Sequence, residues 1–389
     1  MKLAGLRVVD LSVFLPGPYL SMALADHGAE VIKVEAPGEG DPGRHIGLSD
    51  GPTTVFFRNV NRGKKSVVVD LKNPAEREAL LGLVDTADVF IEAFRPGVAD
   101  RLGVDYGTLS ARNPGLVYCS LSAFGQTGPY RNRPAHDMAT EALAGVIGIT
   151  LGADDAPAIP GIPTADILTA LQGLSGILMA LLRRRDTGRG DYLDISMHES
   201  ILSATANVLG PVFAENRQPV AKHERTTGGA AFYQIYGTAD GRHLVLAGQE
   251  PKFIRTLLSA LERPDLIPLC ERGPGPHQEP VIVFLSETFR ARRLAEWVAW
   301  FEPMDVCFAP VNTLPEAFAD PQVLAREAVL RDPEGRPHIA PVIRFLHEPA
   351  AVNLAAPSMG QHSGEFMTKP QPGAREPERR PSATSPASD

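Results

Sequence analysis

The sequence has few cysteines and no excess of basic residues, and both shortages exclude classes of function. Its three cysteines, Cys119, Cys270 and Cys307, are scattered along 389 residues without the Cys-x-x-Cys spacing of a zinc site. We therefore expect a reduced, cytoplasmic setting and no metal. The formal net charge of −8 argues against nucleic acid as a partner, because phosphate binding needs a basic surface.

Long apolar runs and glycine-rich motifs are also scarce. Asp10 interrupts the apolar N-terminus, and stretches such as residues 174–182 are too short to cross a bilayer, so we expect no membrane contact. The loop "LSVFLPGP" has one glycine where dinucleotide-binding folds have G-x-G-x-x-G. Glu35 ends the second predicted strand, where an acid would hold the ribose of NAD, but without the glycines an NAD-dependent dehydrogenase is a weak hypothesis.

The first 125 residues alternate short apolar runs with helical patterns. Runs 6–11, 30–35, 66–71, 88–94 and 116–124 are typical of buried parallel strands, and helices are predicted at 19–28, 74–86 and 106–112. Two more helices are expected, one from Asp137 and one over 166–185, followed by a strand in "GRGDYLDISM". This alternation predicts an α/β fold with a doubly wound, Rossmann-like parallel sheet.

Beyond this region the composition changes. Residues 1–215 are predicted to form the large α/β domain, and the polar segment 216–228 is a linker. Residues 229–320 form a smaller α+β domain that opens with a β-hairpin turning at Asp240 and Gly241. Residues 321–365 return to the large domain. The Pro/Ser/Arg-rich tail, 366–389, is expected to be disordered.

Six blocks in order resemble the class III CoA-transferase superfamily, which includes α-methylacyl-CoA racemases. They are "GLRVVDLSVFLPGPYLSMALADHGAEVIKVE", "NRGKKSVVVDLK", "ADVFIEAFRPGVADRLG", "AFGQTGP", "GRGDYLDISM" and the closing "AAPSMGQHSGE", within a likeness from Leu3 to Glu365. The resemblance implies an interlocked homodimer. It also implies an acyl-CoA thioester substrate, with coenzyme A as part of the substrate and no bound prosthetic group.

Asp166, in "GIPTADILTALQG", falls where this superfamily keeps an aspartate. In the transferases that carboxylate attacks the thioester and carries first the acyl group and then CoA, and in the racemases it is an acid/base. From the residues alone, Thr164 and Asp166 are equally typical of a helix N-cap.

His136, followed by Asp137, matches the racemase branch, as does Glu250 in "AGQEPKF". His136 supported by Glu250 would face Asp166 across the substrate, while Asp137 caps the helix and orients its neighbour. The alternative for His136 is a structural histidine at a helix start. For Glu250, next to Pro251, it is a helix N-terminus.

Basic side chains at strand ends are expected to meet the CoA phosphates. By position these are Arg44, Lys72, Arg95 and Arg101. Ala36 stands where some relatives have an arginine, and each of the four could instead be a solvated surface charge.

We therefore expect a 2-methylacyl-CoA racemase that moves an α-proton between two bases through an enolate. The alternative is a class III CoA-transferase with a covalent intermediate on Asp166. A third hypothesis is a non-catalytic acyl-CoA binder.

Overall fold

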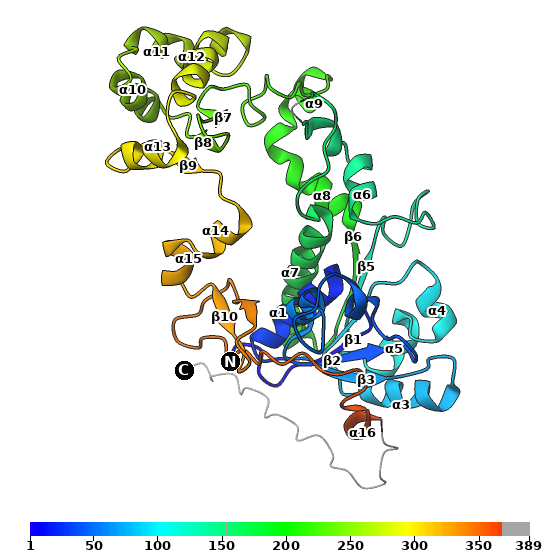
Figure 1. Cartoon of the computed structure of the whole chain (residues 1–389). Helices are drawn as coiled ribbons and strands as arrows, with labels where there is room; N and C mark the ends of the chain where they lie inside the picture. Colours follow the sequence, from blue (N-terminus) through cyan, green and yellow to red (C-terminus); the bar gives the residue numbers. More distant parts are fainter. Residues whose placement is uncertain (153, 368–389) are drawn as a thin grey trace, which may run out of the picture.

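A computed structural model describes residues 1–152 and 154–367, and its centre is a six-stranded sheet (Figure 1). The strand order is β3-β2-β1-β4-β5-β6, and every neighbouring pair is parallel. This is the order of doubly wound sheets, so the predicted fold class is confirmed. The strands are β1 (Arg7–Asp10), β2 (Glu30–Glu35), β3 (Lys65–Val68), β4 (Val89–Glu92), β5 (Val117–Ser122) and β6 (Tyr192–Ser196).

Successive strand residues point to opposite sides of the sheet, and here both sides are apolar. Helices therefore cover both faces. Val8 packs with α1 (Pro16–Asp26) and α7 (Thr164–Thr187), whereas its neighbour Val9 packs with α3 (Pro74–Val84) and α5 (Tyr106–Arg112). Helix α1 begins three residues before the predicted start. Pro16 and Pro18 lie in its first turn, where a helix needs no N–H donors.

Helix α7 decides where the site lies. Its 24 residues span about 36 Å, roughly twice the length of a five- or six-residue strand. Near its C-terminal end, Arg184 donates hydrogen bonds to Gly115 O and Asp88 Oδ1, which precede β5 and β4. The first turn of α7 therefore extends past the carboxyl edge of the sheet.

The length and composition of α7 would suffice for a membrane span, contrary to the expectation from the sequence. Its buried residues Ala170, Gly173, Ile177 and Leu181 recur at helical spacing, and this face packs against the sheet and α1. By its packing α7 is therefore a core helix of the sheet, although its other face is exposed and apolar.

A second, antiparallel sheet has the order β7-β8-β9 and lies at the other end of the molecule (Figure 1). The hairpin between its first two strands turns where predicted, with Gly241 at φ 72°. Its elements are β7 (Tyr233–Gly237), β8 (His243–Ala247), β9 (Phe308–Pro310), α10 (Pro251–Ala260), α11 (Ile267–Glu271), α12 (Glu279–Phe289) and α13 (Leu294–Phe301).

The chain then returns to the large sheet, where His362 N donates to Ser66 O beside β3. The predicted tail lies outside the described residues from 368 onward. The remaining elements are α2 (Val55–Asn61), α4 (Val98–Leu102), α6 (Asp137–Leu143), α8 (Met197–Ser203), α9 (Gly210–Glu215), α14 (Leu314–Phe318), α15 (Pro321–Ala325), β10 (Val329–Arg331), β11 (Pro337–Ile339) and α16 (Ser363–Phe366).

Candidate active site

The junction of α6 and α7 holds three of the predicted site residues. His136 is the N-cap of α6, with extended backbone and no side-chain capping bond, and Asp137 is the first helical residue. The prediction that Asp137 caps its own helix is therefore wrong. Its Oδ1 instead accepts the backbone N–H of Asp166 at 3.0 Å, in the first turn of α7.

Asp166 is the third residue of α7 and does not cap it. The N-cap is Pro163, which has no side-chain donor or acceptor to offer. Burial raises the pKa of Asp166 to about 7, with Asp137 and Glu141 as negative neighbours adding to the shift. No hydrogen-bond donor or cation partners its carboxylate in ranges 1–152 and 154–367. An unpartnered carboxyl that titrates near neutral pH suits a nucleophile or an acid/base.

Glu141 belongs to the same group and was not predicted from the sequence. It lies one turn after Asp137 on α6, so the two side chains share a face. Glu141 is fully buried, and its Oε1 accepts the N–H of Thr164 at 3.1 Å. The spacing of two acids four residues apart in "DMATE" was the available signal, since it directs both at one neighbouring helix.

His136 is exposed and faces the loop after β1. Its ring meets the ring of Phe14 edge-on, with 6.0 Å between centroids and 84° between planes. Phe14 has φ 64°, a left-handed conformation that is rare and costly for an aromatic residue. The strained loop thus places an aromatic side chain beside the predicted histidine.

Buried charges hold this loop in place. Asp10 accepts hydrogen bonds from Ser12 N at 2.9 Å, from Ser12 Oγ and from Ser21 Oγ. Lys33 donates to Ser12 O at 3.0 Å and forms an ion pair with Asp41 at 2.6 Å, with both side chains fully buried. A buried charge is costly unless it is paired, and these charges are paired with each other and with Ser12 of the loop. The network therefore holds the loop in its strained conformation.

Arg44 is engaged inside the protein. Its Nη2 and Nε donate to the two oxygens of Glu35 at 2.6 and 2.7 Å, and Nη1 donates to Pro357 O. Glu35 also accepts from Ser66 Oγ and Asp41 N, which leaves no oxygen available for a ribose. A contact between Arg44 and CoA stays a prediction, because the structure pairs its guanidinium with a carboxylate.

Lys72, Arg95 and Arg101 are exposed at the carboxyl edge of the large sheet, where the prediction places them. Arg95 lines a hollow of about 230 Å³ that also contains the carboxyl groups of Glu92, Asp100 and Asp105. Other lining residues are Tyr106, Tyr118, Gln126 and Tyr192. Burial raises the pKa of Glu92 to about 7. This acidic hollow does not itself suit a phosphate, so contacts of Lys72, Arg95 and Arg101 with CoA stay a prediction.

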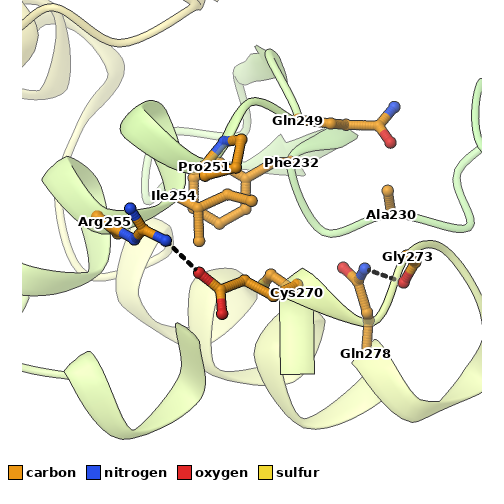
Figure 2. Close-up of a pocket in the computed structure, with 10 residues that line it drawn as sticks. Ala230, Phe232, Gln249, Pro251, Ile254, Arg255, Cys270, Gly273 and Gln278 are labelled. Carbon is orange, nitrogen blue, oxygen red and sulfur yellow. Dashed lines mark hydrogen bonds and ion pairs between the residues drawn. The ribbon is translucent and has the colours of Figure 1, made fainter. Parts of the chain in front are cut away.

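Glu250 lies at the small sheet, as the N-cap of α10 without a side-chain capping bond. Its neighbours Gln249 and Pro251 line a hollow of about 460 Å³ between α10 and α11, which Figure 2 shows. In the described part of a single chain, no hydrogen bond joins Glu250 to His136 or Asp166. Its support of His136 stays a prediction.

Comparison with known proteins decides the family. Residues 3–363 match the model of CoA-transferase family III. The chain belongs to that family. A succinyl-CoA:glutarate CoA-transferase from Homo sapiens is 31% identical, with 94% of this chain and 85% of that protein covered. A succinyl-CoA–D-citramalate CoA-transferase from Chloroflexus aurantiacus is 32% identical, over 93% and 92%.

Solved structures of the family share the fold. A CaiB/BaiF family protein from Brucella suis aligns with a TM-score of 0.80 and 32% identity, covering 94% of this chain and 98% of that one. The family III assignment makes acyl-CoA processing the function class of this protein.

Proposed function

We propose that this protein is a CoA-transferase that moves CoA between carboxylic acids through a covalent intermediate on Asp166. The observation that carries the proposal is the Asp166 carboxyl itself, half-buried beyond the carboxyl edge of the sheet and poised near neutral pH. The naming of family III relatives as CoA-transferases supports this chemistry rather than the racemase expected first.

In this reaction one carboxylate carries two groups in sequence, first the donor acyl group and then CoA. An oxygen of Asp166 attacks the thioester carbonyl of the donor, which expels CoA thiolate and forms an acyl-aspartyl anhydride. The thiolate then attacks the aspartyl carbonyl, releasing the donor acid and leaving CoA as a thioester on Asp166. The acceptor carboxylate attacks that thioester, which breaks its C–S bond, expels CoA thiolate and forms a second anhydride. Return of CoA thiolate to the acceptor acyl carbon yields the new acyl-CoA and regenerates the carboxylate.

The α6–α7 junction supports each step physically. Partial burial of Asp166 limits water, which would hydrolyse an anhydride, and the raised pKa makes its carboxylate more basic than that of an ordinary aspartate. The hydrogen bond from its N–H to Asp137 fixes the backbone from which the side chain projects.

Succinyl-CoA as donor and a short dicarboxylic acid as acceptor form the proposed substrate class. Transferases with succinyl-CoA in their names match this chain over nearly its whole length, and they differ in the acceptor, glutarate or D-citramalate. We infer that this protein shares the succinyl-CoA donor of these two relatives and that the acceptor is specific to each enzyme.

A second copy of the chain is the proposed partner. The outer face of α7 exposes Leu171, Leu178, Met179 and Leu182, the last two at 66% and 65%. Such a contiguous apolar face is unusual on a monomer and suits a homodimer interface. Sedimentation of the purified protein tests this, with a dimer expected at micromolar concentration.

One observation keeps the racemase as a second candidate, since His136 adjoins the Asp137–Asp166 pair. The two activities separate in a single experiment. We expect succinyl-CoA plus labelled glutarate to give labelled glutaryl-CoA, and 2-methylacyl-CoA in D2O to take up no deuterium at the α-carbon. Deuterium uptake without CoA transfer would establish the racemase instead.

A further inference from the structure

Helix α7 has no cap of its own, and α6 supplies the missing acceptors. The first N–H groups of a helix lack partners within the helix, and Pro163 at the N-cap offers none. Glu141 Oε1 accepts from Thr164 N at 3.1 Å, and Asp137 Oδ1 accepts from Asp166 N at 3.0 Å. Two carboxylates from one face of α6 thus cap the turn that carries the reactive carboxyl.

Glu141 is the more deeply buried of the two acids. Its side chain has no exposed surface, and its second oxygen, Oε2, has no hydrogen-bond partner among the described residues. Burying a carboxyl with an unsatisfied oxygen costs free energy that a glutamine or an apolar residue would save. The presence of Glu141 is therefore better explained by a role at the site than by a contribution to the stability of the fold.

Other charged groups around Glu141 come from three helices. Asp137 shares its helix, Asp166 lies on α7, and α8 packs against α6 with His198 and Glu199. His198 lies against the ring of Phe124, and Glu199 is exposed. Of these groups, Asp137 and Asp166 are the electrostatic neighbours of Glu141.

We propose that Glu141 is a positioning residue for CoA transfer. It clamps the first turn of α7 to α6, and so fixes the orientation from which Asp166 attacks the thioester. This inference rests on the proposed function of Asp166, and it assigns a task to a residue outside the reacting atoms.

The test compares Glu141→Leu, which removes both oxygens, with Glu141→Gln, which keeps an acceptor for Thr164 N. We expect the leucine variant to lose kcat by about tenfold or more while KM for succinyl-CoA stays within about twofold, because misplacement of the nucleophile affects the chemical step. The glutamine variant should recover most of kcat. In both, the acidic limb of the pH profile should move to lower pH, because Asp166 loses a negative neighbour.

Asp320→Ala is the matched control. It removes a carboxylate cap from α15, where Asp320 accepts from Gln322 N at 2.8 Å, and it should alter neither kcat nor the pH profile. Equal kcat for wild type and Glu141→Leu, or equal losses in the leucine and glutamine variants, would overturn the proposal. An unmoved pH profile would overturn its electrostatic part.

Hydrogen exchange separates this inference from the proposed function. Amides of residues 164–166 should exchange faster in Glu141→Leu than in wild type, and at the wild-type rate in Glu141→Gln. If wild-type protein transfers no CoA but this pattern holds, the proposed function fails and the clamp stands. If the amides exchange alike in all three proteins, the clamp fails whatever the activity.

Discussion

The carboxylate of Asp137 accepts the backbone N–H of Asp166 at 3.0 Å, so one acid of the site holds the backbone of another. Their side chains are also electrostatic neighbours, and burial together with Asp137 and Glu141 brings the pKa of Asp166 to about 7. A single contact therefore links the capping of α7 to the position and the proton affinity of Asp166.

Removing the acceptor at residue 137 should affect both stability and rate. Asp137→Ala leaves the Asp166 N–H unpaired, and we expect it to cost about 1 kcal/mol in the free energy of unfolding, the usual value of a lost cap. It should also lower kcat. Asp137→Asn keeps an oxygen acceptor and should lose less of both. Urea unfolding and initial rates measure the two effects, and equal behaviour of the two variants would contradict the capping role.

The rate of CoA transfer should fall as the pH drops through about 7. Only ionised Asp166 can attack the thioester, and its pKa is raised to about 7 by burial and by two negative neighbours. The dependence of kcat/KM on pH measures this ionisation in the free enzyme. A profile that stays flat down to pH 5 would mean that Asp166 titrates as an ordinary aspartate or does not act as the nucleophile.

The same raised pKa predicts that Asp166 destabilises the fold at high pH. The folded state holds this proton more tightly than the unfolded chain does. The resulting loss of stability is absent below about pH 4, grows between pH 4 and pH 7, and is complete above about pH 7. Asp166→Asn should therefore gain about 1–3 kcal/mol at pH 8 and nothing at pH 3.5.

Asp186→Asn, at the exposed far end of the same helix, is the control. Its effect on the free energy of unfolding should not grow between pH 4 and pH 7. Thermal unfolding of both variants at a series of pH values measures the difference. A gain for Asp166→Asn that stays the same from pH 3.5 to pH 8 would show that the site does not raise the proton affinity of Asp166.

The buried pair beneath the Phe14 loop should be essential to stability. Lys33→Met leaves Asp41 as an unpaired buried charge and should cost about 3–5 kcal/mol. Arg263→Ala breaks an exposed pair with Asp265 and should leave the unfolding midpoint unchanged. Denaturant titration compares the two, and a mild effect at Lys33 would indicate that water or a shifted proton compensates the charge.

The large sheet could be predicted because its strands carry unbroken apolar runs and alternate with helical patterns. The helix over residues 106–112 matches α5, and the strand over 30–35 matches β2. Helix α2 escaped prediction because it is short, and its start depends on Thr54, whose side chain accepts from Phe57 N. Short helices depend on such caps more than on periodicity.

The site was predicted only in part. His136, Asp137 and Asp166 lie at one junction, and their roles in the reaction stay predictions. The capping role of Asp137 was assigned to the wrong helix, since sequence spacing cannot show which helix an acid faces. Glu141 was missed for the same reason. Glu250 lies beside the small sheet, whereas His136 and Asp166 lie at the α6–α7 junction, and a motif match does not reveal that these residues belong to different parts of the fold.

If Asp166 carries the acyl group and CoA covalently, the intermediate can be trapped. Wild-type protein is incubated with succinyl-CoA, treated with hydroxylamine, digested and analysed by mass spectrometry, with Asp166→Asn treated in parallel. We predict a hydroxamate on the Asp166 peptide of the wild type and none in the variant. Protein that transfers CoA without any modification of Asp166 would rule out this carboxylate as the carrier.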